Sequence, residues 1–298
     1  MRYPLNSQLS WSDYWQTGAA QSLQAHSANP IKQFVQTYFV SKLQRQESIL
    51  DLATGNGALL QQLPDDHSGF CVGVDYSEIA PSAALRQQHH FSRMDGSNLA
   101  FPDESFDWVI SQFGFEYVSR EEGIKELCRV LHAQSQLLLL CHRKDSLLCR
   151  HSQQQLMEGR CILDSGLFSS AWQWCQYADT DKSDRAGLQK LMTSLMKEIR
   201  LPKDSSLLFA LLQSLAKLLT DVQNDRVRGE SAQKIIGQWQ SSLLANIDRL
   251  EQQVEVALSG ADQKRLVESI RQEGFKAKTV ALAEQGRPLA WGMYFSRG

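Results

Sequence analysis

Four short apolar runs separated by helix-like stretches are the feature of this sequence that most constrains its fold. The runs cover residues 49–52, 70–74, 106–110 and 137–141. Runs of this length are typical of buried strands, and strands that alternate with helices predict βαβ units and a parallel sheet. An α/β domain is therefore predicted around these four strands.

The second half of the chain changes character twice. Long helical stretches without strands come first, and then an amphipathic helix that stops at Gly274 precedes two further strands, 275–283 and 290–295. The α/β domain is therefore expected to be interrupted by helices after the strand that ends near Cys141, which is the fifth strand when the full sheet is counted. The predicted parts are an N-terminal arm and first helix at 1–45, an α/β domain at 46–143 and 261–298, and an all-helical insertion at 144–260.

The charges of the chain are balanced, with 31 Lys and Arg against 33 Asp and Glu and a formal net charge of -2. Phosphate contacts need clustered basic residues, so the composition disfavours a nucleic-acid partner. No uncharged apolar run is long enough to span a bilayer and no secretory signal pattern is present, so no membrane partner and a cytoplasmic location are predicted. The six cysteines lack the paired spacing of zinc sites, and no metal is expected.

The strongest local signal is the turn after the first strand. From Asp51 to Gly57 the sequence is Asp-Leu-Ala-Thr-Gly-Asn-Gly, and a helix is predicted to follow it over 58–63. Small residues let the backbone approach a ligand closely at the carboxyl end of a strand, where open parallel sheets bind their ligands. About twenty residues further on, the second strand ends at Asp75, a carboxylate that can accept hydrogen bonds from both hydroxyls of a ribose.

Two cofactors that contain a ribose fit this pattern. A nicotinamide dinucleotide would seat its pyrophosphate on the turn, usually on a G-x-G-x-x-G pattern, but Leu60 stands where the third glycine would be. The carboxylate of Asp51 would repel a pyrophosphate and attract the ammonium and sulfonium groups of S-adenosylmethionine (SAM). Electrostatics therefore favour the methyl donor over the cofactor of a nicotinamide-dependent oxidoreductase.

Several segments in this order resemble the class I SAM-dependent methyltransferases. The segments are the turn at 51–57, the acid at 74–75, the pair Asp95-Gly96, the approach to the fourth strand at 99–109 and the helix at 126–131. Two departures are Ala53, where many members have glycine, and 132–135, which replace a proline-glycine-glycine turn. The resemblance implies a Rossmann-like α/β fold, a seven-stranded methyltransferase sheet with helices on both faces, and SAM as the cofactor.

The resemblance also implies roles for individual residues. The methionine end of SAM is expected on the Asp51 side chain and on the backbone of Ala53, Gly55 and Gly57. Asp75 is expected to hold the ribose, and Tyr76, Asp95 and Gly96 to hold the adenine. Gln112, just past the fourth strand, is expected near the methyl group.

Methyl transfer from a sulfonium is an in-line displacement, so it requires positioning and exclusion of water rather than a protein nucleophile. A group that takes a proton from the acceptor is the remaining chemical need. The candidates are Glu116, Tyr117 and His142, at the ends of the fourth and fifth strands, and each has an alternative role in packing or hydrogen bonding.

The acceptor is predicted to be a small organic molecule, with a protein side chain as the second choice. The loop at 111–117 lacks the Asn/Asp-Pro-Pro-aromatic motif of enzymes that act on adenine or glutamine amides. Phe113 and Phe115 in that loop can line an apolar pocket or simply pack. A non-catalytic module that binds SAM for regulation is the alternative from another functional class.

Two further features have open interpretations. Trp11, Tyr14 and Trp15 can close over the cofactor, because aromatic faces attract a sulfonium, or they can anchor the N-terminal arm. The helical insertion is expected to cap the substrate site, and the alternatives are a homodimer interface or an intramolecular helix pair. The apolar stripe behind those alternatives consists of Ile236, Trp239, Leu243, Ile247, Leu250 and Val254.

Overall fold

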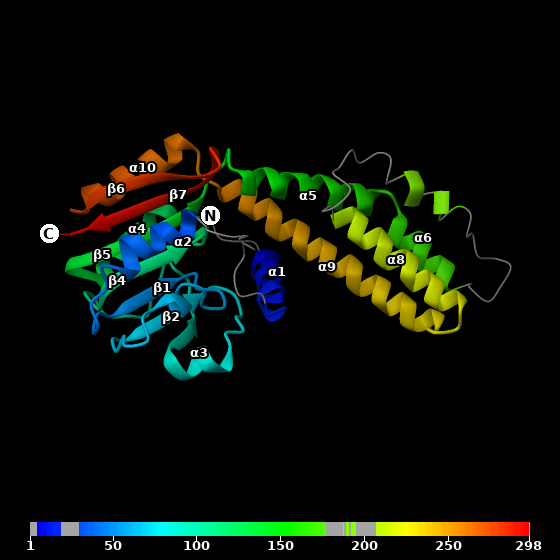
Figure 1. The fold of residues 1–298 in the computed structure, drawn as a ribbon, viewed down its shortest axis with the longest axis horizontal. Helices are drawn as coiled ribbons and strands as arrows, with labels where there is room; N and C mark the ends of the chain where they lie inside the picture. Colours follow the sequence, from blue (N-terminus) through cyan, green and yellow to red (C-terminus); the bar gives the residue numbers. More distant parts are fainter. Residues whose placement is uncertain are drawn as a thin grey trace. The chain divides into compact units, whose positions relative to one another are not determined.

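A computed structural model describes residues 5–18, 30–176, 187, 189–190, 192–194 and 207–297 of the chain. The chain divides into two compact units. The first, here called the α/β unit, consists of residues 1–150 and 252–298, and the second, the helical unit, consists of residues 151–251 (Figure 1).

Within the described residues, seven strands form one sheet in the order β3-β2-β1-β4-β5-β7-β6. The neighbours from β3 to β5 are parallel, whereas β7 pairs antiparallel with both β5 and β6. The strand order reverses between β1 and β4, which is where open α/β sheets bind ligands. The strands are β1 (Ile49–Leu52), β2 (Cys71–Asp75), β3 (His90–Arg93), β4 (Phe106–Gln112), β5 (Leu131–His142), β6 (Lys276–Glu284) and β7 (Arg287–Ser296).

The predicted seven-stranded Rossmann-like sheet is therefore confirmed. Six of its strands coincide with apolar runs in the sequence. The seventh, β3, has the sequence His-Phe-Ser-Arg and none of its residues is buried. A short polar strand at the edge of a sheet carries no apolar run, so the sequence pattern does not reveal it.

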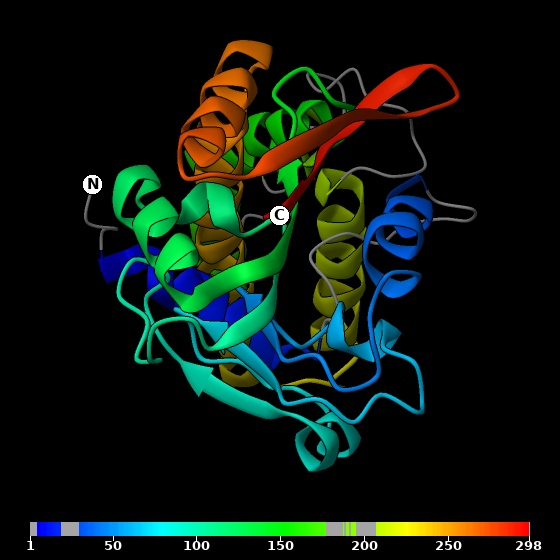
Figure 2. The same cartoon turned by 90° about the vertical axis from the view of Figure 1, so that its left-hand side faces the viewer.

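Side chains of the central strands alternate between two cores, one on each face of the sheet. In β5, Leu137, Leu139 and Cys141 point into one core, where α4 and α10 pack. Leu138 and Leu140 point into the other, where α2 and the π-helix η1 pack. This period of two places helices on both faces (Figures 1 and 2). The helices are α4 (Arg120–Val130), α10 (Gly260–Gln272), α2 (Pro30–Val35) and η1 (Gln36–Val40).

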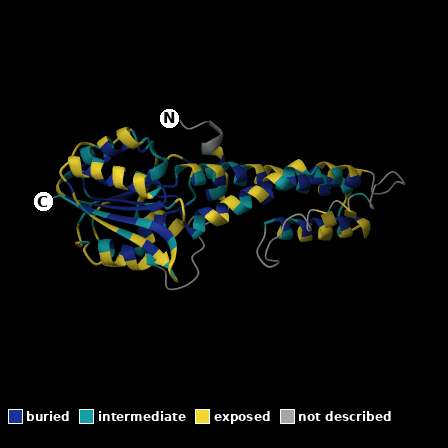
Figure 3. Ribbon diagram, turned by 90° about the horizontal axis from the view of Figure 1, so that it is seen from above, coloured by how far each residue is buried: buried dark blue, intermediate teal, exposed yellow. Residues whose placement is uncertain are grey.

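The burial colours show the same organisation, with the central strands buried and the outer faces of the helices exposed (Figure 3). The Ser259 hydroxyl caps α10 by accepting from the Asp262 backbone amide, and the Asp262 carboxylate accepts from the Ser259 amide in return. Such a capping box satisfies two amide groups that the first turn of a helix leaves without partners.

One predicted helix is shorter in the structure than the sequence pattern indicated. The helix expected over 58–63, after the glycine turn, is a single 3-10 turn, η2 (Leu60–Gln62). Leu63 is extended, with φ -64° and ψ 146°, because the following Pro64 excludes helical geometry at the residue before it. The turn after β1 is therefore followed by a single 3-10 turn and irregular chain rather than by the predicted helix.

The chain leaves and rejoins the sheet at one place. Arg143 and Leu258 form a parallel bridge, the Leu258 amide donates to the His142 carbonyl at 2.8 Å, and the Lys144 amide donates to the Leu258 carbonyl at 3.0 Å. The two ends of the intervening segment therefore lie side by side at the carboxyl end of β5.

The described parts of the segment between these two ends form four long helices. Its helices are α5 (Leu147–Asp164), α6 (Leu167–Gln176), α8 (Leu207–Gln223) and α9 (Gly229–Val256). Glu158 of α5 is buried and accepts from the Leu208 amide at the start of α8. Four members of the predicted apolar stripe, Ile236, Leu243, Ile247 and Leu250, are buried within this part of the chain, and a Cβ at Gly159 of α5 would lie 2.9 Å from Ile247. No described helix is both long and apolar enough to cross a bilayer.

Candidate active site

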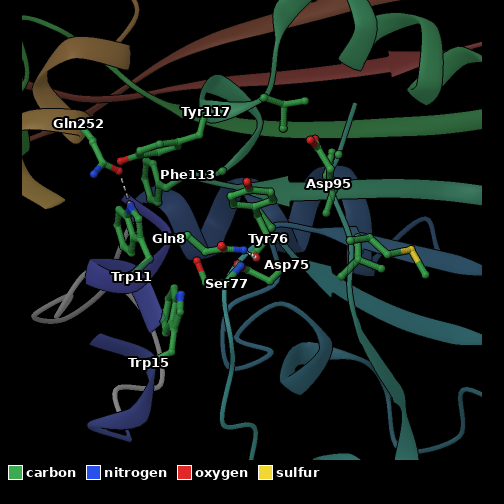
Figure 4. Close-up of a pocket in the computed structure, with 17 residues that line it drawn as sticks. Gln8, Trp11, Trp15, Asp75, Tyr76, Ser77, Asp95, Phe113, Tyr117 and Gln252 are labelled. Carbon is green, nitrogen blue, oxygen red and sulfur yellow. Dashed lines mark hydrogen bonds between the residues drawn. The ribbon is translucent and has the colours of Figure 1, made fainter. Parts of the chain in front are cut away.

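A cavity that is open to solvent lies at the carboxyl ends of β1, β2 and β4 in the α/β unit (Figure 4). Its lining comes from the strand ends and from two helices, α1 (Leu5–Gln16) and the last turns of α9. The lining residues are Gln8, Trp11, Trp15, Leu52, Ala53, Val74, Asp75, Tyr76, Ser77, Met94, Asp95, Gly96, Phe113, Gly114, Tyr117, Val118 and Gln252.

Asp75 is the last residue of β2 and is buried. Its two oxygens accept from the backbone amides of Gly55 and Ser77, each at 2.9 Å. Burial raises the pKa of the carboxyl, and the hydrogen bonds from the Ser77 and Gly55 amides oppose that effect. Asp75 also lines the cavity, so its carboxylate lies beside the space in which a ribose diol would bind.

Asp51 lies in the middle of β1 and is 1% exposed. One oxygen accepts from the Thr54 hydroxyl at 2.7 Å. Burial raises the pKa of Asp51 from 3.8 to about 7, the Thr54 hydrogen bond lowers it, and the charge of Asp75 raises it further. Among the described residues no basic side chain forms an ion pair with Asp51, so a cation brought by a ligand would stabilise its charged form.

Asp95 and Gly96 follow β3 and line the adjoining part of the cavity. One Asp95 oxygen accepts from both the amide and the hydroxyl of Ser97, at 2.9 and 2.6 Å. These bonds hold the carboxylate in one orientation. Tyr76, which follows Asp75, also lines the cavity and is 38% exposed.

The turn after β1 is in close contact with the turn after β4. Ala53 has a φ of 55°, a left-handed conformation that favours glycine. A Cβ added at Gly114 would lie 2.3 Å from the Cβ of Ala53. Gly114 therefore permits an approach between the two turns that no larger residue allows.

Of the three candidate proton acceptors, one lines the cavity and two are buried. Tyr117 lines the cavity, and its ring meets Trp11 edge to face, with centroids 5.6 Å apart. Glu116 and His142 lie behind it, with side chains 0% and 2% exposed. Glu116 Oε1 accepts from the His142 amide and lies 2.7 Å from His142 Nδ1. The ring of His142 also lies 4.5 Å from that of Phe113.

The predicted cofactor residues also divide into two groups. Ala53, Asp75, Tyr76, Asp95 and Gly96 line the cavity, whereas Asp51, Gly55, Gly57 and Gln112 do not. The second group consists largely of the residues that the resemblance assigns to the methionine end. The cavity is therefore lined by the residues expected to contact the adenosine of SAM, whereas most residues expected to contact its methionine end are not part of the lining.

Several lining residues were not singled out in the sequence. Gln8 and Gln252 are the clearest examples, because they come from opposite ends of the chain (Figure 4). Trp11 Nε1 donates to Gln252 Oε1 at 3.0 Å, across a separation of 241 residues. The expected insertion at 144–260 includes Gln252, and no local pattern marks it as a site residue.

Comparisons with known proteins point to one family. Residues 49–134 match the model of a family described as a methyltransferase domain. An uncharacterised methyltransferase-like protein of Schizosaccharomyces pombe is 28% identical over 197 residues, which cover 59% of this chain and 75% of the relative. The demethylmenaquinone methyltransferase of Corynebacterium urealyticum is 32% identical over 85 residues, which cover 28% of this chain and 36% of the relative.

A solved structure of a SAM-dependent methyltransferase from Methanosarcina mazei is 14% identical, with a TM-score of 0.40 over 88% of this chain and 96% of that one. The family match covers the segment from β1 to the start of β5, which carries the turn after β1, Asp75 and Asp95. The sheet order and these sequence matches lead to the same conclusion: the α/β unit belongs to the class I SAM-dependent methyltransferases.

Proposed function

We propose that this chain binds SAM in the cavity and transfers its methyl group to a small organic acceptor. The observation that carries the proposal is the pair of carboxylates, Asp75 and Asp95, at neighbouring strand ends beside the turn after β1. When bound, SAM supplies an electrophilic methyl group on a sulfonium.

The acidic residues support SAM over a dinucleotide. Asp75 is suited to accept from the ribose hydroxyls and Asp95 from the adenine amino group, while Asp51 offers its charge to the ammonium. The three carboxylates would repel a pyrophosphate. The same groups attract a ligand that carries two positive charges and one negative charge.

Aromatic side chains support a small and largely apolar acceptor. Trp11, Phe113 and Tyr117 line the same part of the cavity, and the nearby polar side chain there is the amide of Gln252 (Figure 4). Such a wall excludes water and favours flat or apolar molecules. The Corynebacterium relative is named for demethylmenaquinone, a small-molecule acceptor.

Of the three candidate proton acceptors, we assign contact with the acceptor to Tyr117, because its side chain lines the cavity. Tyr117 could take a proton only in its phenolate form. The buried Glu116–His142 pair packs behind it and would hold the turn that carries Tyr117. In this proposal Glu116 and His142 are positioning residues, since neither lines the cavity.

Isothermal titration with SAM, S-adenosylhomocysteine and NAD tests the cofactor. We expect binding of the first two and none of NAD. Binding of NAD alone would support an oxidoreductase and refute the proposal. Turnover is tested by following S-adenosylhomocysteine formation with fractionated small-molecule extracts; SAM binding without turnover in any fraction would support the non-catalytic module instead.

A further inference from the structure

Helix α1 lies across the strand ends and is hydrogen-bonded there at three places. The Gln8 side chain donates to the Tyr76 carbonyl at 2.7 Å, and the Glu78 amide donates to the Ser12 hydroxyl at 3.0 Å. The Asn56 side chain donates to the Trp15 carbonyl at 3.0 Å. These contacts hold the last turn of α1 against the turn after β1.

Trp15 occupies the space directly above Gly55. A Cβ added at Gly55 would lie 2.5 Å from both Cη2 and Cζ2 of the Trp15 indole. Trp15 is 8% exposed, and Gly55 has a φ of 52°. A glycine that permits close approach is therefore in contact with a side chain of the same protein.

This space is where a ligand belongs in a sheet of this order. It lies at the carboxyl end of β1, next to the reversal of strand order between β1 and β4. The buried Asp51 belongs to the same strand and has no basic partner among the described residues. The lining of the cavity includes Ala53 and Trp15 but neither Gly55 nor Asp51.

Resting on the proposed function, we propose that Trp15 determines which ligands enter the cofactor site. With α1 docked, the adenosine half is accessible and Trp15 occupies the methionine half. An adenosine-like ligand without the amino-acid arm binds without moving Trp15. Complete SAM or S-adenosylhomocysteine binds only after the indole leaves Gly55. The apparent affinity of the protein for either ligand is therefore the intrinsic affinity multiplied by the fraction of molecules in which Trp15 is undocked.

The test compares two ligands that differ in the amino-acid arm. Calorimetry measures the affinities of S-adenosylhomocysteine and 5′-methylthioadenosine for the whole chain and for Trp15→Ala. We expect the substitution to tighten S-adenosylhomocysteine binding about fivefold or more and to change 5′-methylthioadenosine binding less than about twofold. Leu9→Ala is the matched control, because Leu9 lies on the same helix, is 64% exposed and does not line the cavity.

A second variant keeps the indole and weakens its anchoring. Ser12→Ala removes the acceptor of the Glu78 amide, so α1 should undock more often, and S-adenosylhomocysteine binding should tighten by a smaller factor than in Trp15→Ala. This variant also serves if Trp15→Ala does not fold.

The outcomes separate this inference from the proposed function. If both ligands bind and Trp15→Ala weakens or does not change S-adenosylhomocysteine binding, Trp15 is not a block and only the inference is overturned. If neither ligand binds any of the variants, the cofactor site itself is overturned and the inference with it. A gain for S-adenosylhomocysteine alone supports both.

Discussion

Asp51 is the residue at which folding and ligand binding conflict most clearly. A carboxyl group that is 1% exposed and lacks a basic partner among the described residues favours its neutral form, which is why burial raises its pKa to about 7. A bound ammonium would favour the charged form instead. The residue thus lowers the stability of the free protein at neutral pH and suits a cationic ligand.

The first prediction concerns the pH dependence of stability. The pKa of Asp51 is raised from 3.8 to about 7 on folding, so between these values the folded chain binds a proton that the unfolded chain does not. Stability from this group therefore falls as pH rises from about 4 to about 7, by a total on the order of 4 kcal/mol. Asp51→Asn should be more stable than the parent chain at pH 8 and similar to it at pH 4.5 in urea denaturation.

Asp107 is the matched control for that measurement. Burial would raise its pKa, but hydrogen bonds from the Ser48 hydroxyl and amide and the contact with His132 outweigh burial and lower it. Asp107→Asn should therefore lose stability at pH 8, the opposite sign. A loss in Asp51→Asn at pH 8 would contradict the account of Asp51.

The second prediction concerns Asp75. Its oxygens accept from two backbone amides, so Asp75→Asn would turn an NH₂ group toward one of them, and Asp75→Ala would remove both acceptors. We expect Asp75→Ala to weaken SAM binding by about 1 to 3 kcal/mol, and Asp75→Asn to weaken it as well. Calorimetry at constant pH checks this, and unchanged affinity would remove Asp75 from the ribose site.

At the scale of elements, the parallel sheet explains why part of the site is predictable from sequence. Carboxyl ends of parallel strands gather at one edge, so Asp75 is predictable from its place at the end of the apolar run that forms β2. Asp95 follows β3, which has no apolar run, so only the resemblance to the family indicated it. The docking of α1 is not predictable in this way. Its contacts with Asn56 and Tyr76 span 41 and 68 residues, and nothing in the local pattern of either partner indicates them.

The third prediction concerns the contact between the turns after β1 and β4. Gly114→Ala would bring a Cβ to 2.3 Å from that of Ala53, and the clash should cost about 1 to 3 kcal/mol of stability. Gly114 itself has a φ of -139°, so the substitution adds no backbone strain. Ala53→Gly removes the opposing Cβ and relieves a left-handed conformation, and alone it should change stability by less than about 1 kcal/mol.

The double variant gives the decisive measurement. Because Ala53→Gly removes the atom that Gly114→Ala would strike, the pair should recover most of the stability that Gly114→Ala loses. Additive losses in a double-mutant cycle would show that the two turns do not meet as described.

At the scale of the whole molecule, the sequence predicts a change from α/β to helical structure, because apolar runs give way to periodic helical stretches. It does not indicate that the last turns of α9 supply Gln252 to the cavity. The site therefore depends on a residue near the end of a long helical excursion as well as on the family motifs.

The last prediction concerns that excursion. Because Lys144 and Leu258 are hydrogen-bonded neighbours, replacing residues 147–256 with a short Gly/Ser linker joins ends that already lie together, and a shorter loop costs less entropy to close. Both cores of the sheet are formed almost entirely by residues outside the deleted segment. The shortened chain should therefore unfold cooperatively and retain near-ultraviolet circular dichroism.

Ligand binding by the shortened chain provides a second measurement. It lacks Gln252, the partner of Trp11, so α1 should be held less firmly, while Asp75 and Asp95 remain. 5′-Methylthioadenosine, which depends on the strand-end carboxylates, should still bind. A Gln252→Ala variant of the whole chain separates the loss of this contact from the loss of the helices. Loss of the cooperative transition in the shortened chain alone would mean that the sheet needs the helical segment to fold.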